Sequence, residues 1–310
     1  MNTLTIDTKE SPLAPARPGR PRKARRAGAE DSLWLSIFEH VVTYGWLLLI
    51  LFPFAWMLSL ALRKTEALYT ALFFPKEYTL ENFIYLFQGQ FPYRNIQINF
   101  LGSMLNSLIV TVASVALIMV ISVLAAYGFS MINFLGKRIV FYLILTGLMM
   151  PVQVIMLPLI RVNRALHIQG SLLTVILPYA ALGIPLSVFL LTGFFRNIPV
   201  PLLEAARLEG AGHLQVLLKI VLPLSRPALG ANIILQFMYN WNEFALALVL
   251  LRKSKMFTLP IAISSLQGQY MTPWNIVAVT VICSIVPVLI IYMIFQRQFI
   301  AGLTAGALKD

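Results

Sequence analysis

Residues 105–131 read LNSLIVTVASVALIMVISVLAAYGFSM, a run of 27 positions without a charged side chain. A helix of about 20 apolar residues crosses the hydrocarbon core of a bilayer, so this run can cross it with some tilt. Its apolar residues do not alternate with polar ones as the strands of a membrane barrel do. The run therefore predicts a transmembrane α-helix.

Five more apolar runs of similar length flank this one. They are Val41–Leu62 before it and Ile139–Ile160, Ser171–Phe195, Pro227–Leu251 and Asn275–Phe295 after it. Only one of the six, Pro227–Leu251, holds a charged residue, Glu243. The chain is 59% hydrophobic and 12% charged, with mean hydropathy +0.80, whereas soluble domains carry about 25% charged residues. We expect an all-α membrane protein with six transmembrane helices, and the prolines inside several runs predict bent, packed helices.

The first 31 residues differ from everything that follows. They are rich in Pro, Arg and Ala, and seven of the 24 Lys and Arg residues fall within the first 26 positions. They lack the apolar run that a signal peptide needs, so we expect a disordered basic tail over 1–31 and a membrane domain over 32–310. Basic residues before a first span hold it on the cytoplasmic side, which predicts a cytoplasmic N-terminus. A DNA-binding arm is the alternative.

Six spans, with the N-terminus on the cytoplasmic side, place both termini in the cytoplasm. This topology puts 15 Lys and Arg residues on the inner side and nine on the outer side, and without the tail the counts are eight and nine. The loops alone therefore do not fix the orientation. The longest outer connection, Arg63 to Met104, should form a packed cap with a helix near Leu80–Phe87 and Thr79 as its N-cap. That cap would contact an extracytoplasmic partner or only cover the bundle.

The connection from Arg196 to Leu224, between the fourth and fifth runs, predicts two short helices at a membrane surface. Pro201 stands where a helix can start, and good helix formers follow it. Gly210 interrupts them, and a second helix is expected from about His213 to Val221, ended by Pro223. Two helices joined at a glycine corner are the result.

Side chains in this segment favour a docking role. Glu204 and Arg207 stand three residues apart, so they share a helical face and offer one charge of each sign. The small side chains of Ala205 and Ala206 would let the backbone of another protein approach closely. Gly210 allows a corner that a β-carbon would obstruct. An ordinary interfacial helix is the alternative.

The spacing of these residues resembles a known family, the permease subunits of binding-protein-dependent ABC importers. Its loop reads Glu-Ala-Ala, three residues, Gly, nine residues, Ile, one residue, then Leu-Pro. The matching residues, at the same spacing, are Glu204, Ala205, Ala206, Gly210, Ile220, Leu222 and Pro223. The resemblance implies a coupling helix that seats in a cleft of the ATPase subunit, where the glutamate contacts basic residues. Glu209 is a mild departure, since many relatives carry Asp there.

The resemblance covers the chain from the first run onward and is closest to the shorter permease of the maltose-type pair. The motifs that carry it are Met150-Pro151, Leu177-Pro178-Tyr179, Phe194 to Pro199, Trp241 to Phe244, Gln296 to Phe299 and Gly302 to Ala307. It implies import of a sugar or related polar solute by alternating access in a prokaryotic inner membrane. The implied partners are a second permease, a dimer of ATPase subunits and an extracytoplasmic solute-binding protein. Residues of the tail that would reach the ATPases are Gln296, Arg297, Gly302, Thr304 and Gly306.

The fifth run contains a polar stretch that is a candidate solute pathway. It consists of Tyr239, Asn240, Trp241, Asn242 and Glu243. An ionisable residue at the centre of a span costs roughly 2.5–3.5 kcal/mol, so Glu243 should face the bundle interior or a wet cavity. There it would line the path of a polar solute, with Tyr239 and Trp241 against sugar rings. A hydrogen bond that fixes helix packing is the alternative. Asn106 and Ser107 would join the polar lining.

Motifs for catalysis and nucleotide binding are missing from the sequence. No phosphate-binding loop occurs, because Gly136-Lys137 is followed by Arg138 rather than by Ser or Thr. Cys283 is the single cysteine and lies in an apolar run. We therefore expect a transport subunit and not an enzyme, with no bound metal or cofactor and with ATP and Mg on partner subunits. The alternatives are a transporter driven by an ion gradient through Glu243 and a membrane scaffold.

Overall fold

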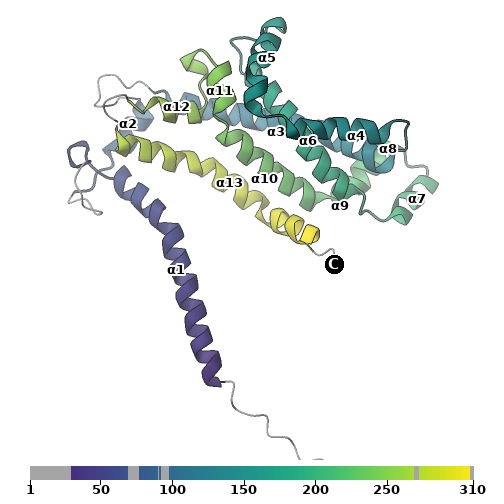
Figure 1. Cartoon of the computed structure of the whole chain (residues 1–310), viewed down its shortest axis with the longest axis horizontal. Helices are drawn as coiled ribbons and strands as arrows, with labels where there is room; N and C mark the ends of the chain where they lie inside the picture. The colour runs from purple at the N-terminus through teal and green to yellow at the C-terminus, as the bar shows by residue number, and fades with distance from the viewer. Residues whose placement is uncertain (1–28, 69–76, 90, 92–97, 269–271, 308–310) are drawn as a thin grey trace, which may run out of the picture. The chain divides into compact units, whose positions relative to one another are not determined.

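The computed structural model describes residues 29–68, 77–89, 91, 98–268 and 272–307 (Figure 1). The described residues are almost entirely helical, and their only β-type pairing is one bridge between Arg63 and Tyr78. The longer helices are α1 (Ala29–Ala61), α3 (Phe100–Met131), α6 (Leu173–Phe195), α10 (Arg226–Asn242) and α13 (Trp274–Ala307). The shorter ones are α2 (Glu81–Gln88), α4 (Lys137–Thr146), α5 (Val152–Ala165), α7 (Val200–Leu208), α8 (His213–Val216), α9 (Leu222–Leu224), α11 (Ala245–Leu250) and α12 (Leu259–Ser265). The predicted all-α class is confirmed.

The chain divides into two units, residues 1–53 and 54–310. In the first unit, every side chain of α1 from Leu35 to Pro53 is exposed, and most of them are apolar. Such a continuous apolar surface suits hydrocarbon as its solvent. The predicted tail, 1–31, lies outside the described residues except for the first three positions of α1.

Four helical stretches of the described chain are long and apolar enough to cross a membrane. They are Leu35–Ala61, Phe100–Met131, Leu173–Phe195 and Trp274–Gln298, which correspond to the first, second, fourth and sixth predicted spans. The third predicted span, Ile139–Ile160, is bent. Lys137–Met149 and Val152–Ala165 meet at 104°, because Pro151 cannot donate the backbone hydrogen bond that would continue the helix. A second bent pair, His213–Leu224 and Arg226–Asn242, brings the possible spans to six.

The fifth predicted span is the one that the structure changes most. The expectation of one continuous helix over Pro227–Leu251 is wrong, since α10 ends at Asn242 and α11 starts at Ala245. Glu243 between them is extended, with φ −68° and ψ 126°. Neither proline nor glycine marks this break in the sequence.

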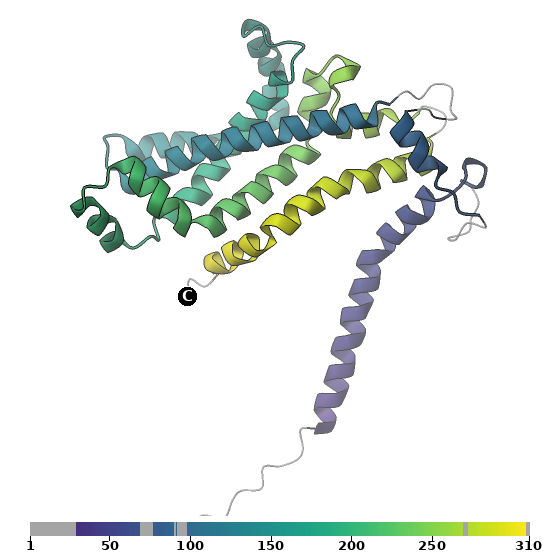
Figure 2. The ribbon, with the colours of Figure 1, turned by 180° about the vertical axis from the view of Figure 1, so that it is seen from behind.

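Within the second unit, α3 packs along α6, and α10 packs against both α13 and α3 (Figure 2). Gly183 on α6 allows this helix to approach α3 and α10 closely. A β-carbon at this position would collide with the Ile118 side chain of α3 and lie 2.6 Å from Oε1 of Gln236 on α10. Small residues at such crossings are typical of membrane bundles, where backbones must come close for packing to be favourable.

The described part of the first long loop forms the predicted cap. α2 confirms the helix predicted near Leu80–Phe87. Thr79 is not its N-cap as predicted, because Leu80 takes that position, although the Thr79 hydroxyl accepts a hydrogen bond from the Glu81 amide at 3.2 Å. The buried Asn82 amide donates to the carbonyls of Ala61 and Arg63, both at 2.8 Å, and its oxygen accepts from Asn275 at 3.0 Å. One side chain therefore joins the end of α1, α2 and the start of α13.

Candidate functional site

The predicted pair of helices with a glycine corner is confirmed between α6 and α10. α7 ends in a left-handed glycine, Gly210, with φ +85°. The Ala211 amide donates to the Ala206 carbonyl and the Gly210 amide to the Arg207 carbonyl, both at 3.0 Å. This bond pair is the Schellman motif, which satisfies the last carbonyls of a helix and reverses the chain. The helical stretch that follows runs from His213 to Leu224, slightly beyond the predicted end.

This corner, residues 200–224, has an inner and an outer face. Leu203, Val216 and Val221 are buried against Tyr127 of α3 and Phe195 of α6. Ala206, Ile220 and Leu222 pack against the same cluster and are half-buried. The motif residues that remain exposed are Glu204, Ala205, Arg207, Gly210 and Pro223. The spacing of the motif therefore combines residues that seat the corner on the bundle with residues that face outward.

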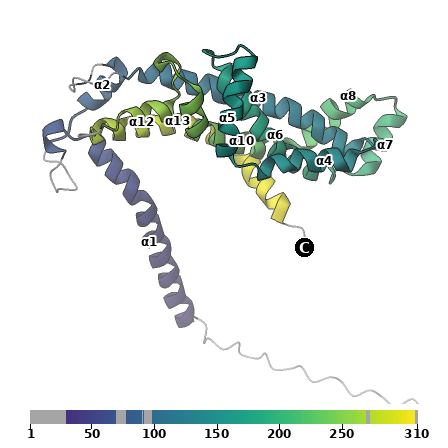
Figure 3. The same cartoon turned by 45° about the horizontal axis from the view of Figure 1, so that its top comes forward.

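Sequence reasoning missed two features of this corner. Leu208 at its tip is 90% exposed, and an apolar side chain held in this way is typical of a protein interface. The start of α8 is also tied to the bundle, since Nδ1 of His213 lies 3.0 Å from the Tyr127 hydroxyl of α3. The helix then widens into a π turn over Leu217–Val221, immediately before the Leu222-Pro223 pair. Figures 1 and 3 show α7 and α8 at one end of the bundle and α2 and α12 at the other.

The structure separates the five residues of the predicted solute pathway. Tyr239 and Asn242 are exposed on α10, whereas Asn240 and Trp241 are buried. Asn240 donates to the Gln236 carbonyl at 2.9 Å, and Trp241 donates to the Ser284 carbonyl of α13 at 3.2 Å. The Trp241 ring also stacks on Phe237 with centroids 5.6 Å apart, so one of its faces is occupied by packing. Tyr239 and Asn242 are the exposed members, and Asn242 lines a second cavity of about 490 Å³ together with Trp241.

Glu243 uses its carboxylate to start α11. Oε1 accepts from the Leu246 amide at 2.7 Å, Oε2 accepts from the Ala247 amide at 3.1 Å, and the Tyr179 hydroxyl of α6 donates to Oε2. Unsatisfied amides at a helix start are costly at membrane depth, and a carboxylate placed there satisfies two of them. Of the two readings of Glu243, these contacts match a hydrogen bond that fixes packing.

Asn106 and Ser107 likewise serve packing. The Asn106 amide donates to the carbonyls of Lys255 and Phe257, at 2.9 and 3.2 Å. The Ser107 hydroxyl accepts from the Leu259 amide at 2.7 Å. The start of α3 thus holds the loop before α12, and the expectation that both residues line a polar pathway is not matched by these contacts.

A polar seam between α6 and α10 escaped the sequence analysis. Gln236 donates to the Ser187 hydroxyl at 3.0 Å and to the Gly183 carbonyl at 3.3 Å, and Ser187 donates to Asn232 at 3.1 Å. Asn232, Gln236 and Asn240 are spaced four apart, a pattern that places them on one helical face. This spacing of polar residues was the signal in the sequence that could have predicted the seam. Hydrogen bonds of this kind between helices are common in membrane bundles.

The predicted tail residues lie on the last turns of α13. Gln296 and Arg297 are exposed, and the neighbouring Gln298 packs over Gly230 of α10. The helix continues through Gly302, Thr304 and Gly306. Across the described residues, no cluster of three or more His, Cys, Asp or Glu side chains could hold a metal ion.

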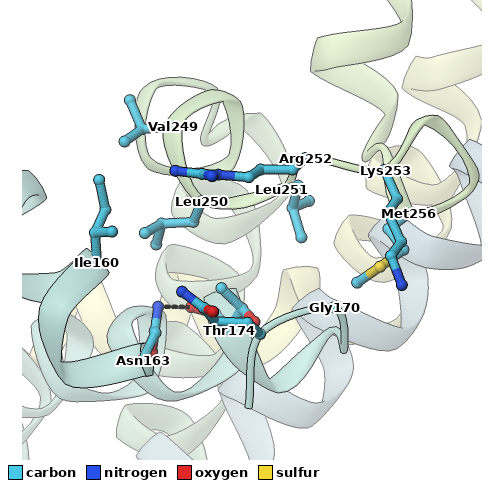
Figure 4. A pocket seen from close by; sticks show the side chains of 11 residues that line it. Ile160, Asn163, Gly170, Thr174, Val249, Leu250, Leu251, Arg252, Lys253 and Met256 are labelled. Atoms are coloured by element: carbon cyan, nitrogen blue, oxygen red, sulfur yellow. Dashed lines mark hydrogen bonds between the residues drawn. The ribbon is translucent and has the colours of Figure 1, made fainter. Parts of the chain in front are cut away.

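A cavity of about 220 Å³ lies beside the start of α6, the end of this helix opposite to α7 in the chain. Figure 4 shows the side chains that line it. Asn163 of α5, Thr174 of α6 and the Arg252-Lys253 pair after α11 line it. The Asn163 amide donates to the Thr174 carbonyl at 3.0 Å, which ties α5 to α6 at the base of the cavity. Since α6 has 23 residues and α7 follows its other end, the cavity and α7 are about 30 Å apart by helical rise.

Residues 118–304, more than half of the chain, match the family described as "Binding-protein-dependent transport system inner membrane component". The chain belongs to this family. It is therefore a permease subunit of an ABC importer, a multi-pass protein of the inner membrane and not an enzyme.

Individual relatives support the same assignment. The chain is 36% identical to the sulfoquinovosyl glycerol transport system permease protein SmoH of Agrobacterium fabrum, over 84% of this chain and 89% of that one. It is 32% identical to the trehalose transport system permease protein SugB of Mycobacterium tuberculosis, over 91% and 99%. A solved bacterial ABC transporter that imports the acidic polysaccharide alginate has the same fold, with TM-score 0.69 and 23% identity, over 91% of this chain and 100% of that one.

Proposed function

We propose that this subunit helps to import a sugar or a related polar solute by alternating access, driven by ATP hydrolysis on separate ATPase subunits. The related permeases support the solute class, since their names specify sulfoquinovosyl glycerol, trehalose and arabinooligosaccharides. The partners would be a second permease, a dimer of ATPase subunits that bind ATP and Mg, and a solute-binding protein. Both termini and the α7–α8 corner would lie in the cytoplasm.

The observation that carries this proposal is the outward face of the α7–α8 corner. Glu204 and Arg207 are exposed there, and among the described residues Glu204 forms no ion pair. A charged side chain held on a folded corner, with no ion pair among the described residues, is suited to a partner subunit. The exposed apolar tip at Leu208 adds the desolvated contact that such an interface needs.

The same geometry supports a route by which motion would pass from the ATPases into the membrane. α7 follows α6 after only the short linker from Arg196 to Pro199, and α8 is tied to α3 through His213 and Tyr127. A push on the corner would therefore act on α3 and α6 together, because these two helices also pack along each other. Closure of the ATPase dimer would turn the pathway outward, and hydrolysis would return it inward.

Glu204→Ala in the reconstituted complex tests this proposal. We expect solute uptake into proteoliposomes to fall at least about tenfold, as expected when a desolvated charge pair at an interface loses one partner. Glu209→Ala is the matched control, because Glu209 is also exposed but lies on another face of the corner. The proposal fails if Glu204→Ala transports at the wild-type rate, or if both variants lose activity equally. Binding of the ATPase subunits, measured by co-purification, separates lost docking from lost folding.

A carrier driven by an ion gradient through Glu243 has less support. Its carboxylate already accepts two backbone amides and the Tyr179 hydroxyl. An ion or proton site would need free acceptor capacity and a wet surrounding. Uptake by this chain alone, in vesicles without ATPase subunits, would revive that hypothesis.

A further inference from the structure

The two opposite charges on one face of α7 do not pair with each other. Glu204 and Arg207 are three residues apart, a spacing at which oppositely charged side chains normally meet on a helix. The structure nevertheless records no ion pair between them. Both side chains are exposed, so burial does not keep them apart. The separation calls for a competing contact of one of the two.

Tyr127 of α3 provides a competing contact for Arg207. Its side chain is 5% exposed, and its ring packs in the cluster that holds Leu203 of α7 and Val216 of α8. The Arg207 guanidinium interacts with the Tyr127 hydroxyl, both through its charge and as a hydrogen-bond donor. Water screens an exposed ion pair, whereas a hydrogen bond to a side chain packed in a core is screened less. The guanidinium is therefore held toward α3 and not at Glu204.

The same hydroxyl contacts the other helix of the corner. It lies 3.0 Å from Nδ1 of His213, the first residue of α8. The two rings also meet edge to face, with centroids 6.0 Å apart. Arg207 stands in the last turn of α7, so the side chains that share this oxygen come from the two sides of the left-handed turn at Gly210. One atom of α3 thus holds α7 and α8 together.

Hydrogen-bond chemistry fixes the direction of the two contacts. A guanidinium has five N–H donors and no acceptor, so Arg207 uses the tyrosine oxygen as its acceptor. The hydroxyl proton is then left to donate to Nδ1 of His213, which requires a neutral imidazole with its proton on Nε2. The donors follow the order Arg207, Tyr127, His213, and each bond in such a chain strengthens the next.

We propose that Tyr127 is a positioning residue of the coupling corner, whose hydroxyl holds Arg207 and His213 and thereby keeps Glu204 unpaired for the ATPase subunit. The inference rests on the proposed function, which makes Glu204 a docking contact. An acid paired within α7 would have to lose that pair before it could bind a basic residue of another subunit. Tyr127 removes this competition before docking, so that the corner is preorganised for its partner.

The ring and the hydroxyl of Tyr127 have separable roles. The ring fills space in the cluster between α3 and the corner, and a phenylalanine ring would fill the same space. Only the hydroxyl bonds His213 and Arg207. Tyr127→Phe therefore removes the positioning contact and keeps the packing.

Tyr127→Phe in the complete complex, held in nanodiscs on a sensor surface, tests the role of the hydroxyl. The measured quantity is the rate at which fluorescent ATPase subunits dissociate. We expect this rate to rise about threefold, because Arg207 becomes free to pair with Glu204 and the bond to His213 is lost. Tyr142→Phe is the matched control, since Tyr142 on α4 is 60% exposed and forms no hydrogen bond among the described residues. It should leave the rate within about 1.5-fold.

Arg207→Gln separates the positioning role from a general loosening of the corner. Glutamine carries no charge, so in this background Glu204 has no ion-pair partner three residues away. Tyr127→Phe should then change the dissociation rate by less than about 1.5-fold, whatever Arg207→Gln does by itself. Equal fold increases in the two backgrounds would overturn the inference, because independent effects combine in this way. A wild-type rate in Tyr127→Phe would overturn it as well.

The tautomer of His213 is a second readout, one that packing alone would not move. It is measured by nitrogen NMR on the complex with isotope-labelled histidine in this subunit, and the His213 signals are those lost in His213→Asn. The wild type should carry the proton on Nε2, and Tyr127→Phe should show a mixture of the two tautomers. A proton on Nδ1 in the wild type would overturn the order of donors and the inference with it.

Glu204→Ala separates failure of this inference from failure of the proposed function. If the ATPase subunits leave the Glu204→Ala complex at the wild-type rate, Glu204 is not their docking contact, and both proposals lose their basis. If they leave it faster, while Tyr127→Phe matches the wild type, the docking role of Glu204 is supported and the positioning role of Tyr127 alone is wrong.

Discussion

Two carboxylates drew attention in the sequence, and the structure places them in opposite situations. Glu204 lies on the α7–α8 corner, is exposed, and forms no ion pair among the described residues. Glu243 lies between α10 and α11, is half-buried, and accepts hydrogen bonds from two amides and a tyrosine. One carboxylate completes the fold, whereas the other is exposed and makes no ion pair among the described residues.

The difference shows that an unusual acid in a membrane protein is not by itself a functional group. A carboxylate at membrane depth is tolerated when the protein supplies hydrogen-bond donors for it. Glu243 accepts from amides at the start of α11 that would otherwise have no acceptor. An exposed carboxylate costs the fold nothing, so its fixed position needs another reason. Substitution of Glu243 should therefore reduce stability, whereas substitution of Glu204 should reduce transport and leave stability nearly unchanged.

The largest effect on stability is expected from Glu243→Ala. It removes the acceptor of the Leu246 and Ala247 amides and of the Tyr179 hydroxyl, each left without a partner at a cost of about 1–3 kcal/mol. We expect a loss of about 2–4 kcal/mol, since partial relaxation and water will recover some of the sum. Denaturant unfolding of the purified permease pair, followed by tryptophan fluorescence, measures it.

Two further variants sharpen that measurement. Glu204→Ala should change stability by less than about 0.5 kcal/mol, as surface substitutions usually do. Glu243→Gln keeps one amide oxygen as acceptor and should fall between alanine and wild type. If Glu204→Ala destabilised the pair as much as Glu243→Ala, the contrast between the two carboxylates would be lost.

Within the corner itself, Gly210→Ala should have the next largest effect. An L-residue at φ +85° costs about 1–2 kcal/mol, and the Schellman bonds that depend on this conformation would weaken. Gly212→Ala is the control, because Gly212 has φ −72° and can take a side chain without strain. We expect transport to fall more than stability in Gly210→Ala, since the corner would no longer hold Glu204 in place.

Equal melting temperatures for the two glycine variants would show that the left-handed turn contributes little. A transport loss in Gly212→Ala as large as in Gly210→Ala would show that bulk, not backbone conformation, limits the corner.

Much of the fold was predictable because lipid imposes a simple rule on sequence. Residues 105–131 had to be one helix, since a charge-free run of that length has no other stable state in a bilayer. The prolines inside the runs predicted bent helices, and the structure has such a bend at Pro151. The break at Glu243 could not be predicted, because Trp241-Asn242-Glu243 holds no residue that ends a helix by itself. At this break, Glu243 accepts a hydrogen bond from Tyr179, which lies 64 positions away in the sequence.

The corner was found from spacing, but spacing could not say which side chains face inward. Ala206, Ile220 and Leu222 pack on the bundle because of how α7 and α8 meet α3 and α6. That arrangement depends on contacts such as His213 with Tyr127, 86 positions apart. The basic cavity was hidden for the same reason, since Asn163 and Arg252 come together only in the folded chain.

A smaller effect is expected from Ser107→Ala, which probes another polar group that completes the fold. Ser107 on α3 accepts from the Leu259 amide at the start of α12, as Glu243 does for α11. Loss of such a cap typically costs about 1 kcal/mol. Ser130→Ala is the control, because its hydroxyl donates only within α3, to the Ala126 and Tyr127 carbonyls. Equal unfolding free energies for the two variants would show that the hydrogen bond from Leu259 to Ser107 contributes no more to stability than the bonds of Ser130 within its own helix.

The smallest effect is expected for Glu77, an acid that is exposed and also paired. It accepts a hydrogen bond from Lys64, which lowers the pKa of the Glu77 carboxyl below its ordinary 4.5 and raises the pKa of Lys64 above 10.5. The contribution of Glu77 is present above pH 4.5 and is lost as pH falls through the lowered value. The contribution of Lys64 is present below pH 10.5 and is lost as pH rises through the raised value.

Stability should therefore be flat for this pair between about pH 5 and 10, and exposed pairs contribute little even there. We expect Glu77→Gln to leave the unfolding midpoint unchanged within error across that range, measured as for Glu243→Ala. A clear loss of stability in Glu77→Gln at neutral pH, absent in acid, would show that an exposed carboxylate can stabilise the fold. Then Glu204 could also be stabilising through a contact of its own, and its exposed position would no longer argue for a partner. An unchanged midpoint leaves burial as the property that separates acids serving the fold from an acid available to another subunit.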